Sequence, residues 1–163
     1  MLGGDLAREE LALDVMVRSV LVLSKVAAEE MTARGRGAIL NVSSMSAFTT
    51  MGTYAAHKAW VVTFTEGLAV ELQGTGVTAT ALCPGLVRTE FHASAGLDAS
   101  VWPEGAWVGV EKVAADALKA VRRGKVIVTP SVRYAAAGAV LRLVPRSLVR
   151  RVAGPATSGR AMV

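Results

Sequence analysis

The stretch Ala38-Ile-Leu-Asn-Val-Ser-Ser44, followed by Tyr54-Ala-Ala-His-Lys58, decides the interpretation of this chain. An apolar run between a glycine-rich turn and polar residues is typical of a buried strand, which we expect over residues 38–43. Tyr54 and Lys58 are four residues apart, so they share one face of a helix. A lysine ammonium beside a phenol lowers the tyrosine pKa from its ordinary value of about 10. Tyr54 is therefore a candidate general acid or base, with the Ser44 hydroxyl as a second polar group for the same substrate oxygen.

Outward from these residues, segments of helical and strand-like character alternate along the chain. Because such alternation implies a parallel sheet with helices on both faces, we expect an α/β domain. Catalytic groups in such sheets lie beyond the carboxyl ends of the strands, where Ser43, Ser44 and the pair Pro84-Gly85 fall. The expected helices are 6–34, 54–73 with Thr53 as N-cap, 110–122, and 132–152 interrupted by Pro145. The expected strands are 38–43, 77–82 and 126–128. Residues 86–109 form a long connection, typical of a lid, that contains Phe91, Trp102 and Trp107.

The bulk composition is that of a globular protein. Of the 163 residues, 52% are hydrophobic and 19% are charged, which excludes a disordered chain. No apolar run reaches the roughly 18 residues of a membrane span, and residues 1–10 do not resemble a signal peptide. We therefore expect a cytoplasmic protein. Its one cysteine, Cys83, follows an apolar strand and is expected to be a small buried side chain.

Basic residues are concentrated at the end of the chain. Residues 117–163 hold ten Lys or Arg and no acid, and Arg142, Arg146 and Arg150 recur every four residues. This pattern leaves open a helix that binds a membrane surface, but favours a terminal helix packed on the sheet with a basic outer face. No nucleic-acid motif and no metal-ligand spacing accompany it, and His57 and His92 are isolated, with His57 expected at the surface.

Three blocks in order resemble the short-chain dehydrogenase/reductase family: Arg34–Ser44, Tyr54–Lys58 and Pro84–Thr89. The resemblance spans about residues 6–130. It implies a Rossmann-type three-layer fold and an NAD- or NADP-dependent oxidoreductase that interconverts an alcohol and a ketone. Residues 1–163 would then be one partial domain of this family.

The resemblance also implies residue roles. Tyr54 would exchange the proton, Lys58 would hold the nicotinamide ribose, and Ser44 would hydrogen-bond the substrate oxygen, with Ser43 as the alternative because three residues are missing between serine and tyrosine. Cofactor contacts would come from Tyr54, Lys58, Pro84, Gly85, Val87 and Thr89, and no metal is expected. Helices 6–34 and 54–73 would form a homo-oligomer interface.

Two departures from the family bear on function. Met16 falls where many members carry an active-site asparagine, and a thioether cannot replace an amide in hydrogen bonding; a plain core-filling role for Met16 is the equal alternative. No counterpart of the family's Gly-x-x-x-Gly-x-Gly turn, which holds the cofactor pyrophosphate, precedes these blocks. The sequence therefore predicts an N-terminally truncated fold with residues 38–42 on an open sheet edge. The alternative function is a catalytically inactive interaction subunit of a full-length relative.

Overall fold

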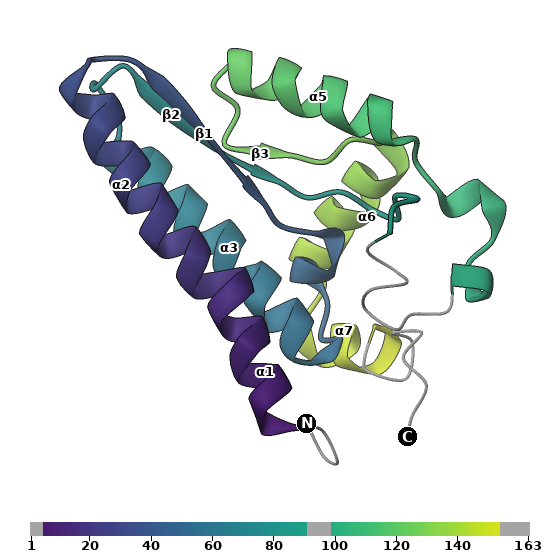
Figure 1. Ribbon diagram of the computed structural model, residues 1–163. Helices are drawn as coiled ribbons and strands as arrows, with labels where there is room; N and C mark the ends of the chain where they lie inside the picture. The colour runs from purple at the N-terminus through teal and green to yellow at the C-terminus, as the bar shows by residue number, and fades with distance from the viewer. Residues whose placement is uncertain (1–4, 91–98, 154–163) are drawn as a thin grey trace.

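The computed structural model describes residues 5–90 and 99–153. Within them, helices lie on both faces of a small sheet (Figure 1), so the expected three-layer α/β fold is confirmed. The principal elements are α1 (Leu6–Leu13), α2 (Ser19–Ala33), β1 (Gly37–Val42), α3 (Gly52–Glu71), β2 (Val77–Leu82), α5 (Val110–Arg122), β3 (Ile127–Val128), α6 (Val132–Leu143) and α7 (Arg146–Val152).

The three strands form a parallel sheet in the order β1-β2-β3. β1 pairs with β2 over its whole length, from Gly37 opposite Val77 to Val42 opposite Leu82. No strand among the described residues pairs with the outer side of β1.

Helices α2 and α3 cover one face of the sheet and α5 covers the other (Figure 1). On the first face, Ile39 packs with Leu68 and Leu72 of α3, and Met31 of α2 lies against them. On the second, Leu82 packs with Val113 and Ala117 of α5. Burial of these aliphatic side chains on both faces holds the carboxyl ends of β1 and β2 in fixed positions.

The predicted helix 6–34 is one continuous helical run that contains an unpredicted π-helical segment, η1 (Asp14–Arg18). The backbone N–H of Ser19 bonds to the Asp14 carbonyl, five residues earlier. The Ser19 hydroxyl donates to the Val15 carbonyl at 2.6 Å. This bond replaces the backbone hydrogen bond from Ser19 that the Val15 carbonyl would accept in a regular α-helix. Met16 lies half-buried in this segment.

Two helix boundaries differ from the predictions. Helix α3 begins at Gly52, and Met51 rather than Thr53 occupies the N-cap position, with no side-chain cap. Residues 132–152 form two helices, α6 and α7, as the expected interruption at Pro145 requires, because a proline disfavours helical backbone at the residue before it. Val144 has an extended ψ of 136°.

Helix α6 presents both basic and apolar side chains to solvent: Arg133 and Arg142 are exposed, in agreement with the expected basic face. Its inner side carries Tyr134, Gly138 and Leu141, while Val132, Val140 and Leu143 are exposed. Because the helix breaks before Pro145, the arginines spaced by four do not form one stripe. Among the described residues, no helix is long and apolar enough to cross a membrane.

Candidate active site

The carboxyl ends of β1 and β2 remain joined beyond their last paired residues. The Ser43 N–H donates to the Leu82 carbonyl at 2.7 Å, and the Met45 N–H donates to the Pro84 carbonyl at 2.9 Å. These two bonds place Ser44 beside Pro84 at one edge of the sheet. The sequence expectation that the serine pair and Pro84 lie together is therefore met by the geometry.

The two adjacent serines differ in what their hydroxyls do. Ser43 is buried and its Oγ donates to the Lys58 carbonyl at 2.7 Å. Ser44 is half-buried and caps the 3₁₀ helix η2 (Met45–Phe48), where its Oγ accepts from the Ser46 N–H at 3.1 Å. Because the Ser43 proton is used inside the fold, Ser44 is the better of the two candidates for a substrate contact.

Lys58 joins the helix to the strand end. Its Nζ donates to the Val42 carbonyl at 3.0 Å and lies 5.7 Å from the centroid of the Tyr54 ring. Burial lowers the pKa of Lys58 from its ordinary value, and the nearby Cys83 thiol acts weakly in the opposite direction. An ammonium has three donors, so two remain for other acceptors. Tyr54 and Lys58 thus lie on one face of α3, near the end of β1.

The segment Pro84–Thr89 leaves the sheet at the same edge. Pro84, Gly85 and Val87 are half-buried and Thr89 is exposed. A Cβ on Gly85 would lie 2.2 Å from Cε2 of Tyr134, so a glycine is required here by the approach of an aromatic ring. Tyr134, whose hydroxyl donates to the Ala106 carbonyl at 2.8 Å, was not foreseen as part of this region.

Tryptophans of the long connection pack on one another. The Trp102 and Trp107 rings meet edge to face at 6.1 Å, and the Arg88 guanidinium lies 4.8 Å from the Trp107 centroid while pairing with Glu104. Val87 pairs with Val108 in an isolated bridge. These contacts hold the connection against the strand ends. Phe91 and His92 lie outside the described residues.

The expectation that His57 lies at the surface is wrong. The side chain is half-buried, and its Nδ1 is buried with no hydrogen-bond partner among the described residues. Cys83, by contrast, is fully buried as predicted. The surface expectation failed because His57 lies one turn before Val61, which is fully buried, so the two share an inward face of α3.

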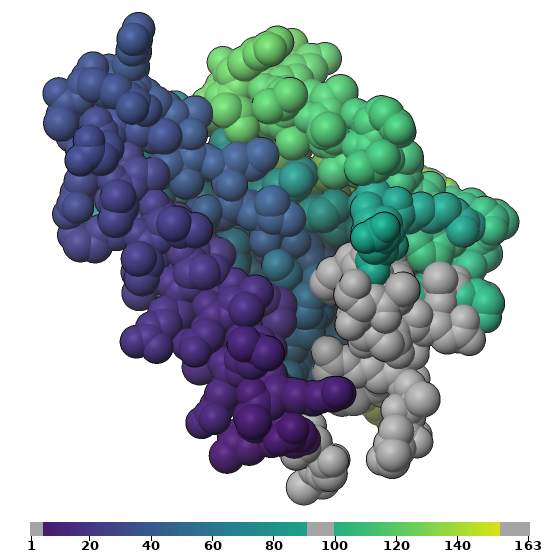
Figure 2. All heavy atoms as spheres, viewed as in Figure 1, coloured from purple at the N-terminus to yellow at the C-terminus, as the bar shows by residue number. Residues whose placement is uncertain are grey.

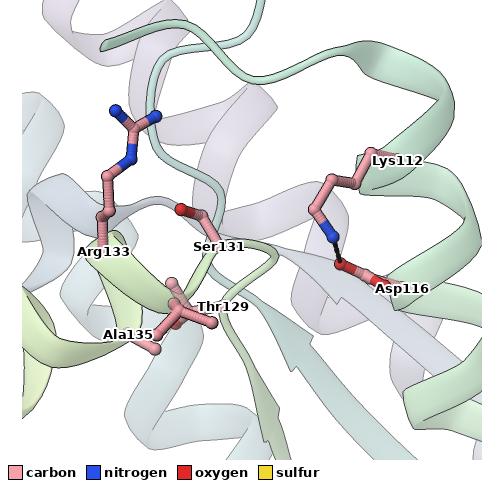
Figure 3. A pocket seen from close by; sticks show the side chains of 7 residues that line it. Lys112, Asp116, Thr129, Ser131, Arg133 and Ala135 are labelled. Atoms are coloured by element: carbon pink, nitrogen blue, oxygen red, sulfur yellow. Dashed lines mark hydrogen bonds and ion pairs between the residues drawn. The ribbon is translucent and has the colours of Figure 1, made fainter. Parts of the chain in front are cut away.

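Two cavities lie on the α5–α6 side of the molecule. Figure 3 shows the first, of about 390 Å³, where Lys112 and Asp116 of α5 form an ion pair at 2.7 Å and Ser131 and Arg133 approach from the start of α6. The second, of about 340 Å³, lies between β3 and α6. Neither is lined by Ser44, Tyr54 or Lys58.

Comparison with known proteins identifies the class of protein. The family model for short chain dehydrogenase matches residues 5–99, so the chain belongs to the short-chain dehydrogenase family. Dehydrogenase/reductase SDR family member 4 of Bos taurus is 40% identical over 82 residues, which are 48% of this chain and 29% of the relative. An uncharacterized oxidoreductase of Myxococcus xanthus is 41% identical over 68 residues, 40% of this chain and 27% of the relative.

Solved structures agree with the fold. A short-chain dehydrogenase from Sphingobium yanoikuyae in complex with NADPH superposes with a TM-score of 0.78 at 26% identity, over 93% of this chain and 60% of the other. A short chain dehydrogenase/reductase from Burkholderia phymatum in complex with NAD superposes with a TM-score of 0.74 at 21% identity, over 85% and 59%; at this identity the likeness concerns the fold alone. The matches cover under a third of these two curated relatives and about 60% of these two solved structures.

Proposed function

We propose that the chain carries the proton-transfer site of an NAD- or NADP-dependent oxidoreductase that interconverts an alcohol and a ketone. The observation that carries this proposal is the position of Lys58, whose ammonium bonds to the end of β1 and lies beside the Tyr54 ring. Family membership supports the reaction class. The bound cofactor would supply the hydride chemistry, and the protein would supply orientation and the proton.

In this mechanism, Tyr54 donates its hydroxyl proton to the substrate oxygen during reduction and takes it back during oxidation. The Ser44 hydroxyl holds the same oxygen in place. Lys58 fixes the position of Tyr54 and offers its two remaining N–H donors to the ribose hydroxyls of the cofactor. Pro84, Gly85, Val87 and Thr89 are the proposed contacts to the nicotinamide end, since their segment starts beside Ser44.

Replacement of Tyr54 by phenylalanine tests the proposal. Tyr54→Phe keeps the ring and removes the proton, so turnover of a ketone with NADPH or NADH should fall by about 100-fold or more. Tyr134→Phe is the matched control, because it deletes a hydroxyl that bonds to the Ala106 carbonyl. Equal turnover in Tyr54→Phe and the unchanged chain would contradict the role of Tyr54.

The second candidate function is an interaction subunit without catalysis. Exposed aliphatic side chains along the α1–α2 run favour it, including Leu11 at 63%, Val15 at 60%, Val22 at 52% and Val26 at 54% exposure. All four side chains are exposed, and the spacing of four residues between Val22 and Val26 in α2 keeps those two on one helix face. Such a row suits pairing with a second copy or with a longer relative.

Cofactor titration separates the two functions. Quenching of tryptophan fluorescence by NADPH or NADH at micromolar concentration supports the oxidoreductase. No response up to millimolar cofactor supports the interaction subunit. The same titration on Lys58→Ala serves as the control, since loss of the ammonium should weaken any specific response.

A further inference from the structure

Helix α6 has two faces of opposite character. Tyr134, Gly138 and Leu141 face the protein, and Tyr134 and Leu141 pack against the buried cluster that contains Phe48. The opposite side, which we call the α6 outer face, consists of Val132, Ala136, Val140 and Leu143. These residues follow the i, i+4, i+8, i+11 spacing that keeps side chains on one side of a helix.

The α6 outer face is strongly exposed. Val132 is 87% exposed, Val140 57% and Leu143 86%. Helix α7 continues the apolar surface with Leu148 at 48% and Val152 at 66% exposure. A set of aliphatic side chains projecting from consecutive helices indicates a surface that contacts an apolar environment.

Cations flank this surface. Around the helix, Arg133 borders the outer face, whereas Arg142 lies nearer the inner side, close to Gly138. Both guanidinium groups are held in place, Arg133 by the Gly105 carbonyl and Arg142 at 4.3 Å from the Phe48 ring centroid. Arg150 and Arg151 are exposed on α7. Because residues 117–163 contain ten basic residues and no acid, no carboxylate of this segment offsets their charge.

We propose that the α6 outer face and the exposed side of α7 dock on the surface of an anionic lipid bilayer. The aliphatic side chains would enter the boundary between headgroups and acyl chains. The flanking arginines would pair with lipid phosphates. The helices would lie in the plane of the interface.

Charge complementarity favours anionic lipid over a second copy of the chain. A two-fold interface brings the same patch of each subunit together. Here it would oppose arginines to arginines, since residues 117–163 contain no acid and Asp116, which lines the first cavity with Arg133, is already paired with Lys112. The second cavity also borders this surface: Ala135 and Ala139 line it from α6, and Lys125 and Arg142 line it as well. These cations add positive charge beside the apolar face.

Vesicle co-sedimentation of the full chain tests the proposal. Vesicles of phosphatidylcholine with about one-third phosphatidylglycerol should bind the protein, and pure phosphatidylcholine should bind it at least tenfold more weakly, since the arginines interact with anionic headgroups. Raising the salt concentration should weaken binding because surface charges are screened.

Two variants and a control locate the surface. Leu143→Asp should lower the partition coefficient by about tenfold or more, because it removes a large exposed apolar group that would enter the bilayer and adds a negative charge. Arg150→Gln with Arg151→Gln should reduce binding to anionic vesicles alone. Leu118→Asp is the control, because it makes the same substitution at an exposed leucine of α5, which is 54% exposed. This variant should bind to anionic vesicles as the unchanged chain does.

Recovery of the protein in the supernatant with both vesicle types would overturn the proposal. Equal losses in Leu143→Asp and Leu118→Asp would overturn the assignment to α6. If Leu143→Asp instead abolishes self-association measured by sedimentation velocity without lipid, the face is an interface between copies, and the lipid proposal is wrong.

Discussion

The buried amide of Asn41 links β1 to the two helices that cover it. Its Oδ1 accepts from the Ser24 hydroxyl of α2 at 3.2 Å, and its Nδ2 donates to Oγ1 of Thr65 on α3 at 3.1 Å. Thr65 in turn donates to the Val61 carbonyl at 2.7 Å. Because all three side chains are buried, the polar groups depend on one another for hydrogen bonds. The network fixes the position of β1 along α2 and α3. It therefore also fixes the position of Ser44, which follows the end of β1.

Replacing Asn41 by alanine should destabilise the fold. The Ser24 hydroxyl would lose its buried acceptor, so we expect the free energy of unfolding to fall by about 1–3 kcal/mol. Urea denaturation followed by circular dichroism measures it. A double-mutant cycle with Thr65→Val should show coupling, and strictly additive losses would contradict a shared network.

The Cys83 thiol gives stability a pH dependence. Burial raises its pKa to about 11 from an ordinary 9.0, so the folded state favours the neutral thiol. In the unfolded state the thiol ionises first, and the stabilisation, complete below pH 9.0, declines as pH rises towards about 11. Two pKa units correspond to at most about 3 kcal/mol.

Denaturation at several pH values checks this effect by comparison with Cys83→Ala. The lowered pKa of Lys58 acts in the opposite sense, because a lysine that loses its proton more readily when folded makes stability rise with pH below 10.5. The difference between the two proteins reports mainly the thiol, because Cys83 is only the smaller influence on the pKa of Lys58, and it should shrink from pH 8 to pH 11. Parallel pH profiles would contradict the burial argument.

At the scale of elements, the sequence predicted the features that depend on neighbouring residues alone, such as the ends of strands and helices. The bounds of β2 and α5 agree with the predicted 77–82 and 110–122, because glycines, prolines and apolar spacing mark their ends. The spacing of Tyr54 and Lys58 likewise predicted their shared face. By contrast, the π-helical segment η1 has no composition of its own, and the difference between Ser43 and Ser44 depends on a tertiary contact to Lys58. Neither is a property of a short sequence window.

The packing of α6 against the end of β2 was likewise not predictable, because Gly85 and Tyr134 are distant in sequence. Gly85→Ala should force the Tyr134 ring away, since the new Cβ would lie 2.2 Å from it. We expect a loss of about 1–3 kcal/mol in the free energy of unfolding. Thermal denaturation measures the loss. Gly67→Ala is the control, because nothing lies within 4 Å of that position, and equal effects of the two substitutions would contradict the contact.

At the scale of the whole molecule, two apolar surfaces lie on different elements. The α1–α2 row, with Val22 near its centre, is the surface that we propose for self-association. The α6 outer face is the one proposed for lipid. Figure 2 shows α1 and α2 as a continuous ridge along one side of the molecule. Because the two surfaces are separate in sequence and in element, substitutions can test them one at a time.

Val22→Glu should shift the chain towards monomer. A charge in the middle of an apolar helix–helix contact is left without a partner. The dissociation constant of the oligomer should therefore rise by at least tenfold. Sedimentation equilibrium across a concentration series measures this change. Leu118→Glu on α5 should leave the association unchanged. A monomer already present in the unchanged chain would contradict the proposed self-association.

The outer side of β1 has a consequence for handling the protein. Among the described residues, the backbone amides and carbonyls on that side have no neighbouring strand, and Ala38 and Val42 beside them are exposed. Apart from the Val42 carbonyl, which accepts from the Lys58 ammonium, this row of donors and acceptors is a template with which another extended polypeptide can pair. A concentrated solution of the isolated chain would therefore be prone to ordered aggregation, whereas a segment seated along β1 would complete the sheet and remove the template.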